Sequence, residues 1–139
     1  MAREAILRDT KPLVSRRHKC ATATAIPKGT YLKYSTDPDV VLASSGVGDM
    51  FAGFAHADVN NSTDSGFNTE TSVTADRGGV YELTASLAIV LGQLVKTAGI
   101  NCVMAATDAD VTNSFGLVLG RCVETASAGE VVNVEVFAW

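Results

Sequence analysis

The chain is poor in charged, aromatic and proline residues: of its 139 residues, 19% are charged, 6% are aromatic and three are prolines. Long apolar runs are also missing. The longest stretch without a charge, Leu83 to Val95, is broken by Thr84, Ser86, Gly92 and Gln93, whereas a membrane-spanning helix needs about 18 apolar residues. Charges interrupt the first dozen positions, which argues against a secretory signal. The sequence therefore predicts no membrane partner and a chain that stays where it is made.

Cysteine and histidine are scarce as well. Cys20, Cys102 and Cys122 show no C-x-x-C spacing, so neither a zinc site nor a disulfide framework is indicated. We expect reduced, structural thiols of a cytosolic product, with no metal and no cofactor. His56 and Asp58 would share one face of a strand, but no nucleophile motif accompanies them. We expect no catalytic residues and no enzyme; a small β-barrel enzyme using His56 and Asp58 is the lesser alternative.

The charges that are present are divided unequally along the chain. Residues 1–34 hold eight lysine or arginine residues against two acids, and residues 35–139 hold three against thirteen. The cluster Arg16-Arg17-His18-Lys19 could attract phosphate, but the first twenty residues contain no aromatic side chain that could stack on bases, and the acidic remainder opposes binding. We therefore expect a protein partner with an acidic surface and no nucleic acid.

Threonine and valine are abundant, with 14 and 17 residues, and their branched side chains favour strands. Turn residues recur at short intervals, and no period of 20 to 50 residues repeats. We expect a mainly β, small single domain over residues 21–139, barrel-like or sandwich-like, with at most short helices. Residues 1–20 should form an extended, basic N-terminal arm, which Pro12 restricts to an edge position because it lacks a ladder donor.

Two segments carry more specific expectations. Between Tyr81 and Val95, alternating apolar residues favour strands with a break near Ser86, although a helical stripe also fits. At the C-terminus, valines at 132, 134 and 136 and alanine at 138 form one strand face that is typical of a core. The opposite face carries Phe137 and Trp139, which we expect to lie at an oligomer interface, where aromatic residues are enriched.

Four stretches and the C-terminal region carry a family resemblance through their order along the chain. They are Ile26-Pro-Lys-Gly-Thr-Tyr-Leu32, Phe51-Ala-Gly-Phe-Ala55, Asp76-Arg-Gly-Gly-Val-Tyr-Glu-Leu83, Ala88-Ile-Val-Leu-Gly-Gln-Leu-Val95 and the region Gly116 to Val136 with its Ala-Gly-Glu turn. In this order they resemble the head-decoration, or capsid cement, proteins of tailed bacteriophages, related to the lambda head-decoration β-tulip fold. The resemblance covers roughly residues 24–138. The basic arm is not part of the pattern.

The resemblance implies a homotrimer on the outer surface of the virion, assembled in the host cytoplasm. It would stabilise the expanded capsid by binding where subunits of the major capsid protein meet, without catalytic residues. In this hypothesis the arm contacts the capsid, with its apolar residues adding a strand to a capsid sheet. The expected capsid-binding residues are Arg3, Ile6, Leu7, Arg8, Lys11, Leu13, Val14, Arg16, Arg17 and Lys19. A tail or neck component of the virion is the alternative.

Overall fold

The computed structural model describes residues 5–20, 25–36, 40–59, 72–113 and 115–138, with residues 9–13, 113 and 115 described by their backbone alone. The described part of the chain is mainly β, with 58% of its residues in strands or bridges and 7% in helices, as the sequence predicted. The strands are β1 (Ile6–Cys20), β2 (Tyr31–Tyr34), β3 (Val40–Ala43), β4 (Phe51–Ala55), β5 (Ser72–Ala85), β6 (Leu94–Thr97), β7 (Cys102–Ala105), β8 (Val118–Cys122) and β9 (Val131–Val136). The short helices are α1 (Asp108–Asn113) and η2 (Phe115–Leu117).

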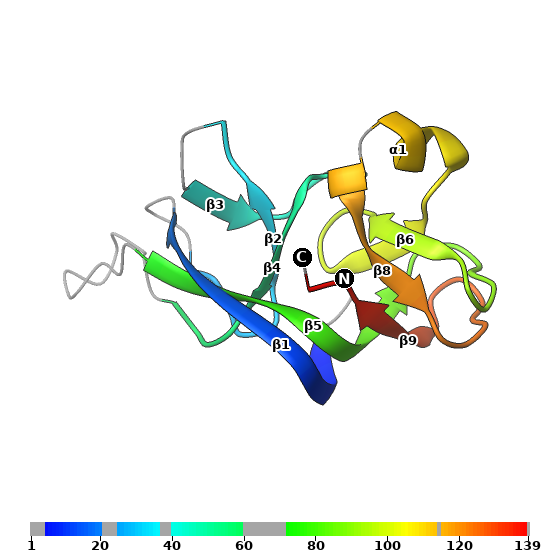
Figure 1. The fold of residues 1–139 in the computed structure, drawn as a ribbon, viewed down its shortest axis with the longest axis horizontal. Helices are drawn as coiled ribbons and strands as arrows, with labels where there is room; N and C mark the ends of the chain where they lie inside the picture. The colour runs from blue at the N-terminus through cyan, green and yellow to red at the C-terminus, as the bar shows by residue number, and fades with distance from the viewer. Residues whose placement is uncertain (1–4, 21–24, 37–39, 60–71, 114, 139) are drawn as a thin grey trace.

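The strands pair in two closed rings that share β5. In the first ring, the N-terminal barrel, the order is β1, β3, β2, β4 and β5, and β5 pairs again with β1. In the second ring, the C-terminal barrel, the order is β5, β7, β6, β8 and β9, and β9 pairs again with β5. Figure 1 shows β5 crossing from the strands on the left to those on the right. One long strand therefore serves as a wall of both barrels.

The two barrels are built alike, strand for strand. In each, the first strand pairs with the third in parallel, and the other four pairings are antiparallel. An isolated bridge closes the same place in both, Ile26–Val59 in one and Ile89–Ala126 in the other. Each barrel also has a register shift between its second and fourth strands, at Lys33 and at Lys96. The chain is therefore an internal repeat.

The repeat depends on a glycine where the fourth strand crosses the last. Gly53 in β4 and Gly120 in β8 occupy the same register position. A Cβ at Gly53 would lie 2.9 Å from the Ala75 Cβ, and one at Gly120 would overlap the Glu135 carbonyl oxygen. The backbones approach so closely here that only glycine fits without a shift.

Glycines also allow β5 to pass between the barrels. Gly78 and Gly79 in its middle have φ angles of 90° and 79°, a region that other residues rarely adopt. Opposite them, β1 is irregular, because its register against β5 shifts between Asp9 and Leu13. Such bulges increase local twist, which lets the two long strands bend together around the junction.

The core is a pair of packed clusters. One fills the N-terminal barrel, and the larger one fills the C-terminal barrel and the junction. At the junction, the Phe54 ring centroid lies 4.9 Å from that of Tyr31, 5.0 Å from Phe51 and 4.3 Å from Tyr81. Burial raises the pKa of both tyrosines above its usual value. Aromatic pairs of this kind add about 0.5–1.5 kcal/mol each beyond area burial, so they hold the two barrels together.

Two local expectations are confirmed. β5 ends at Ala85, one residue before the predicted break at Ser86, and no helix forms between it and β6. On the last strand, Val132, Val134 and Val136 are at most 3% exposed, as their alternation predicted. The strand interpretation was therefore correct for the last strand and for both ends of the 81–95 segment, whereas residues 86–93 form a connection with one isolated bridge at Ile89.

Candidate functional site: the basic strand β1

The N-terminal segment is extended, as expected, but it belongs to the barrel wall. β1 pairs antiparallel with β5 from Ile6–Glu82 to Lys19–Ser72, and its end at Cys20 is 6% exposed. This corrects the interpretation of the segment as an arm outside the core. Local sequence missed it because the partner strand lies about 60 residues away. Deleting the segment would remove a strand that closes the N-terminal barrel.

The other edge of β1 is open over most of its length. β3 pairs with it only at Lys19 and Cys20, and no strand in the described part of the chain pairs with the rest of that edge. The internal repeat provides a comparison for this unpaired edge. β5 is the counterpart of β1 in the second barrel, and its matching edge is covered by β1 itself. An uncovered edge presents unpaired backbone groups to another chain.

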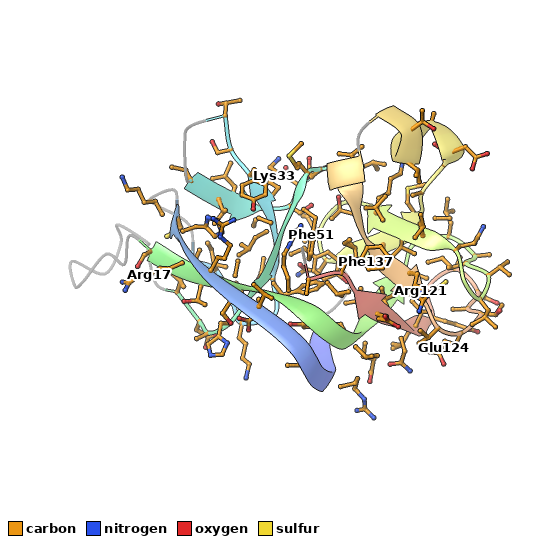
Figure 2. The ribbon with its side chains drawn as sticks, in the orientation of Figure 1. Arg17, Lys33, Phe51, Arg121, Glu124 and Phe137 are labelled. Carbon is orange, nitrogen blue, oxygen red and sulfur yellow. The ribbon has the colours of Figure 1, made fainter. Side chains whose placement is uncertain are left out.

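Exposed basic side chains follow this strand. The Arg8 side chain is 60% exposed and lies 3.6 Å from Glu82. Arg16, Arg17 and Lys19 are also exposed. Figure 2 places Arg17 on the left of the molecule, beside the start of β5, where its guanidinium donates to the Ser72 hydroxyl at 2.8 Å. The strand therefore presents positive charge to solvent, and Arg8 and Arg17 contact residues of β5.

The remaining predicted contact residues divide into three groups. Ile6 and Val14 are exposed, at 39% and 38%, so they could contact a partner. Leu7 packs against the core and is less available. Arg3 lies outside the described residues, as do the side chains of Lys11 and Leu13.

The lesser alternative, in which His56 would act together with Asp58, is not supported by the contacts of these two residues. His56 Nδ1 lies 2.6 Å from Asp76 Oδ2, whereas Asp58 accepts a hydrogen bond from the Lys28 backbone amide at 2.7 Å. The other oxygen of Asp76 accepts the Ser15 hydroxyl at 2.6 Å. Sequence spacing could not show this, because β1, β5 and the end of β4 meet only in the folded barrel.

The geometry of this cluster favours a structural role. In a nucleophilic triad the serine hydroxyl gives its proton to the imidazole. Here the Ser15 hydroxyl donates to the Asp76 carboxylate, and so the carboxylate separates serine from His56. Asp76 is 5% exposed, whereas Ser15 and His56 are exposed, so the cluster ties β1 to β5 at the surface of the barrel wall.

In the described residues, each barrel has a lysine–aspartate pair, and the two lysines occupy equivalent positions. Lys33 Nζ lies 3.6 Å from Asp49, and Lys96 Nζ lies 2.7 Å from Asp110. The Lys96 hydrogen bond, followed by the Thr107 amide and hydroxyl, lowers the pKa of Asp110 to about 2. For Asp49, burial opposes ionisation, but backbone amides and Lys33 lower its pKa overall. Both carboxylates are tied to their own loops and stabilise them.

The predicted oligomer interface is only partly visible. Phe137 is half-buried, and its amide donates to the Leu119 carbonyl at 3.0 Å, while Trp139 lies outside the described residues. The three cysteines are free. Within the described residues, no group of three or more potential ligands could hold a metal, and no helix is long and apolar enough to cross a membrane.

Comparison with known proteins gives a likeness in fold. No protein-family model matches the sequence, and no curated protein is significantly similar to it. Among solved structures, the chain is similar to the head fiber gp8.5 N base of bacteriophage phi29, with a TM-score of 0.52 and 17% identity. The match covers 90% of this chain and 94% of the phage protein chain. At this identity the likeness shows a shared fold.

Proposed function

We propose that the protein is a structural component of a tailed-phage virion that decorates and stabilises the head. The observation that carries this proposal is the fold likeness to a phage head fiber base, which spans nearly the whole of both chains. The ordered sequence resemblance to head-decoration proteins supports the same class independently of the fold. That the chain is a trimer of the lambda-type β-tulip class, on the outer capsid surface, is the finer part of the proposal.

In this proposal β1 binds the major capsid protein. Its exposed basic residues fit an acidic surface, since complementary charge steers association and fixes orientation. Its open edge offers backbone donors and acceptors to an extended segment. Because β1 closes the N-terminal barrel, the contact is made by a strand already held in place, which lowers the entropy that binding must overcome. Phe137 and Trp139 are proposed to join the copies of the trimer.

Charge reversal on β1 tests the proposal better than deletion, which would open the barrel. Arg16→Glu with Arg17→Glu should abolish cosedimentation of the purified protein with phage heads stripped of it. Lys28→Glu is the control, because Lys28 is exposed on the same barrel but lies outside β1. Undiminished binding by the double variant, with a normal circular dichroism spectrum, would refute the contact.

The two alternatives make different predictions. A tail or neck component would bind isolated tails or necks but not emptied heads. An enzyme using His56 would lose an activity in His56→Ala while keeping its fold. The Asp76 geometry supports the structural reading, in which that variant has no activity to lose.

A further inference from the structure

One end of the C-terminal barrel is aliphatic. Leu87, Val90 and Leu91, in the connection between β5 and β6, are 55%, 57% and 62% exposed, and Val123, just after β8, is 42% exposed. We refer to these four residues as the aliphatic end. Isolated apolar residues on a surface need no explanation, but a contiguous group marks a binding site more often than not.

The backbone keeps the two segments of this end together. The Val90 carbonyl accepts a hydrogen bond from the Cys122 thiol at 2.9 Å. The Leu91 amide donates to the Thr125 hydroxyl at 3.1 Å. The Gly92 amide donates to the Cys122 carbonyl at 2.9 Å. These hydrogen bonds therefore hold the backbone of the two segments in place, and with it the positions of the aliphatic side chains.

The N-terminal barrel serves as an internal control for this feature. Its corresponding turn has the same hydrogen bonds: Gly29 donates to Ala55, as Gly92 donates to Cys122. Yet the positions that match Val90, Leu91 and Val123 are Pro27, Lys28 and His56. Because the same turn forms with a proline and two polar residues at these positions, folding does not require Val90, Leu91 or Val123. Their presence on the second barrel needs another reason.

Arg121, two residues before Val123, is exposed but lies 3.4 Å from Glu135, so the other charges of the hairpin set the sign beside the aliphatic end. The hairpin between β8 and β9 carries Glu124 and Glu130, and no lysine or arginine occurs in residues 83–95 or 122–139. Glu124 accepts a hydrogen bond from the Asn133 amide at 2.8 Å, and Glu130 accepts one from the Ser127 amide at 3.1 Å. Both carboxylates are thereby fixed near the aliphatic end, where they repel nucleic acid and anionic lipid.

We propose that the aliphatic end is a second docking surface, which binds a protein surface of the phage head that presents aliphatic side chains beside lysine or arginine. This inference rests on the proposed function, in which β1 takes an acidic surface. A contact between the aliphatic ends of two copies would bring like carboxylates together. A contact between the aliphatic end of one copy and β1 of the next would occupy the strand that the proposed function assigns to the capsid. Figure 2 places Arg17 and Glu124 at opposite ends of the long axis, so the two surfaces can bridge neighbouring head proteins.

The repeat supplies a variant that changes the surface and keeps the backbone hydrogen bonds of the turn, but loses the one that the Val90 amide donates to the Gln93 side chain at 2.8 Å. Val90→Pro with Leu91→Lys gives the second turn the Ile-Pro-Lys-Gly sequence of the first, whose backbone already accommodates it. Its affinity for stripped phage heads in a cosedimentation titration should fall roughly tenfold or more, the effect expected for losing a buried aliphatic anchor. The control Pro27→Val with Lys28→Leu adds two aliphatic residues to the other barrel and should change affinity less than about twofold.

The outcomes separate the inference from the proposed function. If the first variant binds heads like the wild type, or if the control changes affinity as much, the inference is wrong while head binding stands. If the first variant alters the sedimentation coefficient of the free protein, the occupant is a second copy and the inference is equally wrong. If the wild type does not bind heads, both proposals fail. Circular dichroism of each variant confirms that it is folded.

Discussion

Replacing Gly120 by alanine should destabilise the protein by about 3 kcal/mol or more, at the upper end of the cost of overpacking. The added Cβ would overlap the Glu135 carbonyl oxygen and lie 2.9 Å from its carbon and 3.0 Å from the Val136 Cα. Carbon atoms prefer about 3.5–4.0 Å. All three atoms are backbone atoms of β9, which is paired with β8 at this point. No side chain can rotate away, so the strands themselves must separate.

Gly92→Ala is the matched control, because there an added Cβ meets no neighbouring atom and only the backbone conformation is unfavourable for alanine. Gly92 has a φ of 87° and no atom within 4 Å of an added Cβ. Alanine there should cost only the left-handed backbone conformation, about 1–2 kcal/mol. Urea unfolding followed by far-ultraviolet circular dichroism, at one protein concentration, measures both variants. If Gly120→Ala proves no more destabilising than Gly92→Ala, the backbone crossing is not as close as described.

Three further changes probe other parts of the structure. Leu83→Ala, at a position 1% exposed in the larger core, should cost about 2–5 kcal/mol in urea unfolding; a loss below 1 kcal/mol would mean that the core collapses around the gap. Asp76→Ala should cost about 1–3 kcal/mol and speed amide hydrogen exchange around Ser15, because β1 loses an internal partner; unchanged exchange would contradict that role. The lowered pKa of Asp110, about 2, means that its carboxylate stabilises the fold fully above its ordinary value near 4 and loses this effect as pH falls toward 2. Urea unfolding at a series of pH values should therefore show a shallower acid loss in Asp110→Asn, and an unaltered slope would argue against the pair with Lys96.

The sequence identified the exposed basic residues of the candidate site but misjudged their setting. Arg16 and Arg17 are exposed as expected, because burying a charge is costly unless it is paired. Their strand was interpreted as an arm because its few apolar residues form no periodic face. Periodicity fails there, since the bulges between Leu7 and Leu13 shift which side of β1 faces the core. The alternative site considered for His56 used its neighbour in sequence, Asp58, whereas the carboxylate that His56 contacts is Asp76 of β5.

The internal repeat escaped detection for a related reason. Few residues are shared by the two barrels, and the clearest are Ile26, Gly29 and Lys33, which match Ile89, Gly92 and Lys96. Backbone hydrogen bonds are independent of most side chains, so two segments can keep one topology while their sequences diverge. What remains is glycine at a positive φ or at a close crossing, where no other residue fits well.

The sequence by itself determined that this is a β protein. Threonine and valine favour strands, turn residues divide them, and alternating valines bury one face of the last strand. These are local properties, set by the branching of a side chain and by the period of a strand. The tertiary structure alone decided that two barrels share β5, that β1 closes the first and leaves an edge open, and that aliphatic residues gather on the second. Those features depend on pairing between distant strands, and contacts of that kind leave no pattern along the chain.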